Sequence, residues 1–395
     1  MSTSVLSLVG AAVATACGMS RTDLCLRDGM VSFGAAREGE AIDCTGCWIV
    51  PGFMELHFHG AAGHRTLDLS RDAYRAMAKF LASRGVTSFL MAVSACAFDK
   101  TLECVDFAAA TMAEGLPGAR LAGVYMEGPC LKNAGGMKPE LLRVPDPEEL
   151  EELLEHGRGI IKIMTLAPEM PGAMELVERL VAQCVVPAAG HSSASAAELR
   201  EAVRRGLRHV THLGNNGEGD IRCVKGRYQH DGPLLEMLDN DQLTAEIIAD
   251  GVHVAPQLVK LFCRAKGVAN CAAITDGCAA SGLEDGNCFF PNPLGQLEEF
   301  TVKGGALYVA GTGQLTGSLL TMNKAFMNVQ RFAGLTPAEA ARCCGSTPRR
   351  IAKLEPQEIV SGKKANLVII SKEGVVKLTV ADGKIIYRKN EKGNE

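Results

Sequence analysis

The sequence predicts an α/β protein whose central part is a TIM-like (β/α)8 barrel. Two observations predict it: short apolar segments alternate with amphipathic helical segments through the middle of the chain, and both ends are rich in strand-like segments. An open, doubly wound sheet is the alternative arrangement. No Gly-x-Gly-x-x-Gly or Gly-x-x-x-x-Gly-Lys-Ser/Thr motif follows a strand, so the signature of a nucleotide-binding sheet is absent from the sequence.

The eight expected barrel strands are short and mostly apolar, as strands buried on both faces are. They are Trp48–Val50, Thr87–Ala92, Leu121–Met126, Ile160–Thr165, Val185–Ala189, His209–Thr211, Ala245–Ile248 and Ala272–Thr275. Helical patterns lie between them, over Arg71–Arg84, Pro147–His156, Gly172–Gln183, Ala194–Arg204 and Pro256–Lys266. This alternation predicts parallel strands joined by helices.

The two ends of the chain share a different pattern. Strand-like segments occur at Ser4–Val9 and Val31–Phe33, and again near the other end at Asn366–Ile370, Val375–Val380 and Lys384–Tyr387. The last two are separated by Asp382-Gly383, which indicates a hairpin turn. We therefore expect residues 1–50 and 355–395 to form one small β-domain, and residues 51–354 to form the barrel.

Composition narrows the function classes. Lys and Arg number 41 and Asp and Glu 45, which gives a net charge of −4 without a basic stripe, so we expect no nucleic acid or membrane partner. The apolar N-terminus lacks a Lys or Arg before Arg21, which argues against a signal peptide. The fifteen cysteines are odd in number and scattered, as expected of reduced thiols in a cytoplasmic protein.

Polar residues follow several of the expected strands, where a barrel carries its reactive side chains. His57 and His59 lie two apart in an extended segment, so both rings can face one cation. Glu127 ends an apolar strand, where an unpaired carboxylate would be costly. Together with His191 and His212, these residues predict a metal site. The alternatives to a metal site are that the histidines only pack in the core and that Glu127 forms a salt bridge.

Asp276 ends the last expected strand and is a suitable general base, although a structural Asp at a turn is common. His253, which follows the seventh strand, is assigned to the substrate. His209 lies one strand face away from His212, so we expect it to pack beside the metal site or to support a ligand. Cys278 is close to Asp276, but no neighbouring residue indicates an activated thiol.

The chain resembles the N-acetylglucosamine-6-phosphate deacetylases of the amidohydrolase superfamily over nearly its whole length. The motifs that carry the resemblance are Pro51–Gly60, Met126–Pro129, Gly190–Ser192, Thr211–Leu213, Ala249–Val254, Ile274–Asp276 and Leu315–Met322. The resemblance implies a barrel with a small β-sandwich domain formed by both termini. It also implies a cytoplasmic, homodimeric enzyme that removes the acetyl group from an N-acetyl amino sugar phosphate.

The resemblance also implies roles for individual residues. Glu127, His191 and His212 would hold the main divalent metal, zinc or iron, and His57 with His59 would add a second ion. Asp276 would be the acid and base. The remaining residues implied to contact the sugar or its phosphate are His253, Asn215, Asn216 and the segment from Leu315 to Met322.

The departures from the family pattern lie at the phosphate end. The loop Gly135–Glu140 is two residues shorter than usual, with Met137 where a His is expected and Lys138 as a replacement cation. The usual phosphate-binding Arg falls on Gln229, with Arg227 two places away. An Arg binds phosphate through two parallel hydrogen bonds, which Gln229 cannot supply. An unphosphorylated N-acetyl sugar, an N-acyl amino acid bound through Arg227, or a barrel that only binds its ligand are therefore alternatives.

Overall fold

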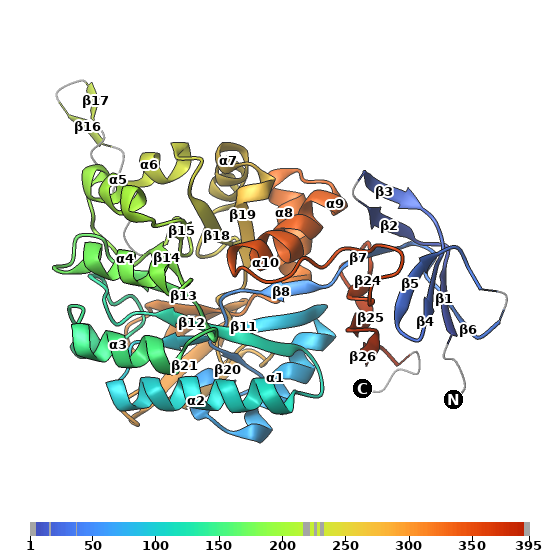
Figure 1. Cartoon of the computed structure of the whole chain (residues 1–395), viewed down its shortest axis with the longest axis horizontal. Coiled ribbons are helices and arrows are strands. Elements are labelled where there is room, and N and C mark those ends of the chain that lie inside the picture. The colour runs from blue at the N-terminus through green and yellow to red at the C-terminus, as the bar shows by residue number, and fades with distance from the viewer. Residues whose placement is uncertain are drawn as a thin grey trace.

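The computed structural model describes residues 5–15, 17–36, 38–215, 222–224, 227–229 and 233–390, with backbone alone for 222–224 and 227–229. Its centre is the predicted barrel, an eight-stranded parallel sheet (Figure 1). The strands, in chain order and in sheet order, are β8 (Phe53–Glu55), β11 (Val86–Ser94), β12 (Arg120–Glu127), β13 (Ile161–Leu166), β14 (Val186–Ala189), β15 (His209–Val210), β18 (Thr244–Ile248) and β19 (Cys271–Ile274).

One expected strand has a different place. The segment Trp48–Val50 does form a strand, β7 (Cys47–Pro51), but this strand pairs with β2 and β24 of the terminal sheets. The first barrel strand is the next one, β8, which begins after Gly52 and pairs with β11. The two strands follow each other so closely that periodicity alone does not separate them, and the sequence-based assignment of Trp48–Val50 to the barrel is wrong.

The barrel closes between β8 and β19 through a side chain. The buried Glu55 carboxylate accepts the Thr275 hydroxyl at 2.6 Å and the Thr275 backbone N–H at 3.2 Å. Just above, the backbone N–H groups of His59 and Gly60 donate to the Gly277 carbonyl. Glu55 therefore replaces a backbone contact at this seam, directly beneath Asp276.

Helices cover the outside of the barrel, and some of them begin at a capping side chain, such as Ser70, Asp146 or Ser195. They are α1 (Arg71–Ser83), α2 (Phe98–Glu114), α3 (Pro147–His156), α4 (Ala173–Ala182), α5 (Ala196–Arg205), α6 (Pro233–Asp239), α7 (Pro256–Lys266) and α8 (Met322–Ala333), followed by α9 (Pro337–Ala341) and α10 (Thr347–Ile351). Among the residues with assigned positions, no helix is long and apolar enough to cross a membrane.

Strands from both ends of the chain lie together beside the barrel (Figure 1). One sheet contains β1 (Val5–Val9), β4 (Leu24–Arg27), β5 (Met30–Phe33) and β6 (Glu40–Asp43), and the other contains β2 (Ala12–Thr15), β3 (Gly18–Arg21), β7, β24 (Leu367–Ser371), β25 (Val376–Ala381) and β26 (Lys384–Arg388). Asp382 and Gly383 form the turn between β25 and β26, both with positive φ. An apolar cluster with residues from both sheets, including Leu8, Ile49 and Ile369, is buried there. We propose that the described parts of residues 1–50 and 355–395 form one small domain and those of 51–354 the barrel domain.

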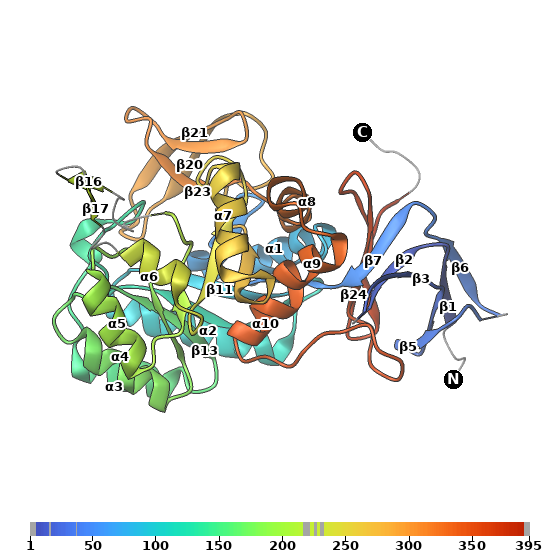
Figure 2. The same cartoon turned by 90° about the horizontal axis from the view of Figure 1, so that it is seen from above.

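A second antiparallel sheet is inserted between β19 and α8. It consists of β20 (Gly286–Pro291), β21 (Leu297–Lys303), β22 (Ala306–Val309) and β23 (Leu315–Ser318), and we call it the lid sheet. Figure 2 shows the lid sheet lying along one side of the barrel. Several of its side chains, among them Phe290, Phe300 and Leu315, line the cleft at the carboxyl ends of the barrel strands.

Candidate metal centre

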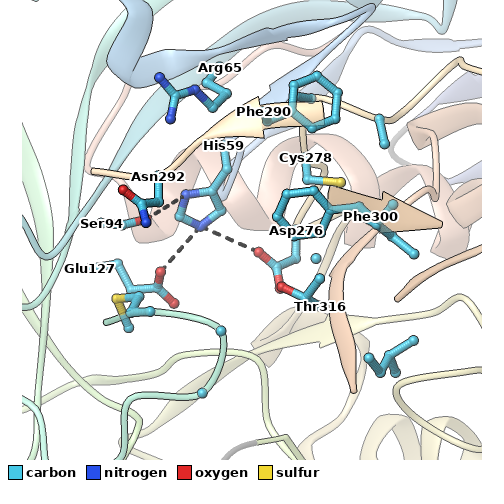
Figure 3. Close-up of a pocket in the computed structure, with 18 of the residues that line it drawn as sticks. His59, Arg65, Ser94, Glu127, Asp276, Cys278, Phe290, Asn292, Phe300 and Thr316 are labelled. Atoms are coloured by element: carbon cyan, nitrogen blue, oxygen red, sulfur yellow. Dashed lines mark hydrogen bonds and ion pairs between the residues drawn. The ribbon is translucent and has the colours of Figure 1, made fainter. Parts of the chain in front are cut away.

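Six side chains from five barrel strand ends meet at the bottom of this cleft. They form two groups whose ligand atoms lie close enough to hold an ion: Glu127, His191 and His212 in one, and His57, His59 and Asp276 in the other. Figure 3 shows His59 with Ser94, Glu127 and Asp276 around its ring. The parallel strands all point their carboxyl ends into the same mouth, which is why residues distant in sequence converge.

The first group is buried and tightly spaced. The Nε2 atoms of His191 and His212 each lie 3.1 Å from Glu127 Oε1 and 3.2 Å from each other. The Nδ1 of His191 donates to the Asn133 carbonyl at 2.8 Å, which leaves the lone pair of Nε2 facing the group. These atoms offer two nitrogens and a carboxylate oxygen to a single cation.

The second group is arranged in the same way. The Nε2 atoms of His57 and His59 lie 3.0 Å apart, and Asp276 Oδ1 lies 3.9 Å and 3.5 Å from them, respectively. His57 donates its Nδ1–H to Glu246, and the Nδ1 of His59 is hydrogen-bonded to the Ser94 hydroxyl at 3.1 Å. With Nδ1 of His57 donating to Glu246, its Nε2 offers a lone pair, and His59 offers its own when its Nδ1 donates to Ser94, so the donor set fits a bound metal.

Glu127 belongs to both groups by position. Its Oε1 lies 3.1 Å from the rings of the first group and 3.5 Å from His57, whereas Oε2 lies 3.2 Å from His59. Burial alone would raise the pKa of Glu127, but the surrounding histidines outweigh it and hold the pKa well below its usual range. The carboxylate is therefore ionised and placed between the two groups.

Three of these residues have strained backbones. His191, His212 and Asp276 have φ values of 50°, 28° and 51°, in the left-handed region that non-glycine residues rarely adopt. Each of these residues lies two positions after the last residue of a barrel strand. Backbone strain of this kind persists only where the surrounding structure holds the residue in place, and it is common at functional sites.

The cleft above the two groups has a volume of about 430 Å³. Its walls include aromatic residues of the lid sheet and two cations, Arg65 and Lys138, and each cation is paired with a carboxylate. Arg65 contacts Asp68 at 2.8 Å and donates to the Pro291 carbonyl, and Lys138 forms an ion pair with Glu298 of β21.

Some of the residues expected to contact the substrate line the cleft, and others lie outside the described residues. His253, Asn215 and Leu315 line the cleft. Asn216 and the side chain of Arg227 lie outside the described residues, although the Arg227 backbone forms part of β17 (Arg227–Gln229), which pairs with β16 (Arg222–Val224). His253 donates to Asp250 at 2.6 Å. Burial opposes its charge, but Asp250 outweighs this effect and raises the pKa of His253.

Sequence reasoning missed several residues of the site. Glu246, Ser94, Arg65 and the lid-sheet aromatics were not among the candidates, although a charged residue inside the apolar run of β18 is a detectable signal for Glu246. Cys278 does line the cleft. Burial raises its pKa to about 12, which keeps the thiol protonated and unreactive.

Comparison with known proteins agrees with this geometry. The model of the amidohydrolase family matches residues 48–386. An N-acetylglucosamine-6-phosphate deacetylase of Bacillus subtilis is 31% identical over 86% of this chain and 84% of its own, and an N-acetylgalactosamine-6-phosphate deacetylase of Escherichia coli O157:H7 is 29% identical over 82% and 83%. The structure of a mutant N-acetylglucosamine-6-phosphate deacetylase of Mycobacterium smegmatis with its sugar phosphate has a TM-score of 0.87, with 27% identity, and covers 98% of this chain and 100% of that one.

Proposed function

The chain belongs to the amidohydrolase family, and from this premise we propose that it hydrolyses the N-acetyl group of N-acetylglucosamine 6-phosphate, releasing acetate and the amino sugar phosphate. The observation that carries the proposal is the pair of adjacent ligand groups, with Glu127 between them, beneath a cleft large enough for a sugar. The relatives that match over most of the chain are named as deacetylases of amino sugar phosphates.

We assign Glu127, His191 and His212 to one divalent ion and His57, His59 and Asp276 to a second, with zinc or iron as the metal. When bound, the metal activates a water molecule and polarises the acetyl carbonyl. Asp276 takes a proton from the attacking water and passes it to the leaving nitrogen. His253, fixed by Asp250, contacts the substrate, and the lid sheet excludes bulk water from the cleft.

Lys138 is our candidate for the contact with the substrate's phosphate. It lines the cleft on the short loop after β12, and its partner Glu298 holds the position that an incoming anion would take. The same pairing favours a second candidate function, hydrolysis of an unphosphorylated N-acetyl sugar or another N-acyl compound, because both described cations of the cleft wall already have carboxylate partners.

Acetate release from a substrate panel separates these functions. We expect the metal-loaded enzyme to act fastest on N-acetylglucosamine 6-phosphate, then on the galactosamine isomer, and slowly on N-acetylglucosamine and N-acetyl amino acids. Faster turnover of the unphosphorylated sugar would remove the phosphate from the proposal. Faster turnover of an N-acetyl amino acid would remove the sugar as well.

The role of Asp276 is tested by Asp276→Asn. We expect turnover to fall by about 10²- to 10⁴-fold, the range for losing a general acid–base, while the ion held by Glu127, His191 and His212 remains bound. Asp285→Asn is the matched control, because Asp285 accepts from the Gly304 N–H and does not line the cleft. Retained turnover in Asp276→Asn would contradict the assigned role.

We further propose that the enzyme is a cytoplasmic homodimer. The cysteines for which the structure gives a state are free thiols, as expected in a reducing compartment. The dimer rests on the family resemblance, which implies a site shared by two subunits. Light scattering of the purified protein tests it, and a monomer at the concentrations used for activity would contradict it.

A further inference from the structure

Glu246 is a buried carboxylate that belongs to neither ligand group but contacts a residue of each. It lies on β18 and is fully inaccessible to solvent. Its Oε2 accepts from His57 Nδ1 at 3.1 Å and from the His212 backbone N–H at 3.2 Å, and its Oε1 lies 3.2 Å from His209 Nε2. One side chain therefore connects a ligand of the second group to a ligand of the first.

These contacts matter because a buried carboxylate is costly unless it is paired. Glu246 meets this condition, because its Oε2 accepts from the His57 ring and from the His212 backbone N–H and its Oε1 faces the His209 ring. His209 is itself held by Thr244 through a 2.7 Å hydrogen bond. The carboxylate thus lies between the His209 and His57 rings, and its side-chain hydrogen bond is to His57.

His57 differs from the other ligand histidines in its outer partner. His59 contacts a hydroxyl and His191 a carbonyl, both neutral, whereas the Nδ1 of His212 has no hydrogen-bond partner among the residues that the structure describes. Only His57 donates to a carboxylate, which raises the basicity of its Nε2 and fixes the tautomer. The Tyr125 ring, 4.4 Å from the His57 ring, packs against the same imidazole.

Charge balance gives Glu246 a second role. Two divalent ions bring four positive charges into a buried site, and the ligand carboxylates Glu127 and Asp276 supply two negative charges. Glu246 adds a third negative charge without occupying a ligand position. Removing it should therefore disfavour the second ion more than the first, since its closest ligand contact is the ring of His57.

We propose that Glu246 is a positioning residue that enables the chain to bind its second metal ion, by orienting His57 and by linking the two ligand groups through His212. The inference rests on the two-ion assignment of the proposed function. It extends that assignment, because it names a residue outside the two ligand groups on which binding of the second ion depends.

The test is the number of metal ions per chain, measured by mass spectrometry after dialysis against buffered metal. We expect two ions in the wild type and one in Glu246→Gln, with affinity for the second ion about 10- to 100-fold lower. Asp250→Asn is the matched control. Its carboxylate also accepts from a histidine Nδ1, but that histidine is in neither group, so this variant should keep two ions.

The outcomes separate the two claims. One ion in the wild type would overturn the two-ion assignment and this inference with it. Two ions bound with unchanged affinity in Glu246→Gln, together with two in the wild type, would overturn only the role of Glu246.

If Glu246→Gln does not fold, a measurement on the wild-type protein still tests the proposal. Nitrogen-15 spectra of the zinc-loaded enzyme should show His57 protonated at Nδ1 and bound to metal at Nε2. The opposite tautomer would overturn the inference without any substitution.

Discussion

Thr275→Val tests how the barrel seam positions Asp276, the residue that we propose as the general base. Thr275 precedes Asp276, and its hydroxyl donates to Glu55 Oε2 at 2.6 Å while accepting the Gly277 N–H at 3.0 Å. Valine has nearly the same shape but neither donates nor accepts. The substitution therefore removes both hydrogen bonds without opening a large cavity.

The expected loss of stability follows from these two bonds. Burial raises the pKa of Glu55 to about 7, so its bond to Thr275 lies between a neutral hydrogen bond, worth about 0.5–1.5 kcal/mol, and one to a charged partner, worth about 1.5–3 kcal/mol. Leaving the buried Gly277 N–H unsatisfied costs about 1–3 kcal/mol more. The Thr275 backbone N–H still donates to Glu55, which reduces the loss. We expect the free energy of unfolding to fall by about 3 kcal/mol. We expect kcat to fall by about 10- to 100-fold, because Asp276 is no longer fixed against the seam.

Urea unfolding and acetate-release kinetics measure the two effects on metal-loaded protein. Thr87→Val is the control, because Thr87 is equally buried but contacts Phe53 and Gln357, away from the cleft. It should cost about 1 kcal/mol and leave kcat unchanged. If the two variants have the same stability and the same kcat, the seam does not position Asp276 and the reasoning is refuted.

Two further predictions concern charged pairs. Because Asp250 raises the pKa of His253, their pairing stabilises the fold most below the ordinary histidine pKa of about 6.5 and weakens as the pH rises through the raised value. In urea with excess metal, Asp250→Asn should therefore lose more stability at about pH 6 than at about pH 9, and an equal loss at both would contradict the assignment. Glu298→Gln should release Lys138 for the substrate's phosphate and lower KM for N-acetylglucosamine 6-phosphate, but not for the unphosphorylated sugar. Glu299→Gln is its control, since Glu299 contacts Asn287 and does not line the cleft, and an equal shift in both variants would exclude Lys138 as the phosphate contact.

The barrel was predictable because its strands are short, apolar and separated by helical patterns. The segment Pro147–His156 has the same limits in the sequence and in the structure. The lid sheet was not predicted, because β20 and β21 are largely exposed and lack a continuous apolar face. Their position depends on packing against the barrel mouth rather than on local pattern.

The convergence of the six candidate metal and acid–base residues was predictable from their places at strand ends. Arg65 and Ser94 were not, because neither lies in a recognisable motif. Ser94 is the last residue of β11, and Arg65 lies in the two-residue strand β10 (His64–Arg65). The Lys138–Glu298 pair joins segments far apart in sequence, so only the tertiary structure shows that Lys138 meets a carboxylate.

The most direct test of the whole account is the activity of metal-free enzyme as a divalent ion is added back. We predict no acetate release from N-acetylglucosamine 6-phosphate by the metal-free protein, and full recovery as zinc or iron reaches two ions per chain. Turnover by the metal-free enzyme, or metal-loaded enzyme that releases no acetate from any N-acetyl amino sugar, would contradict it.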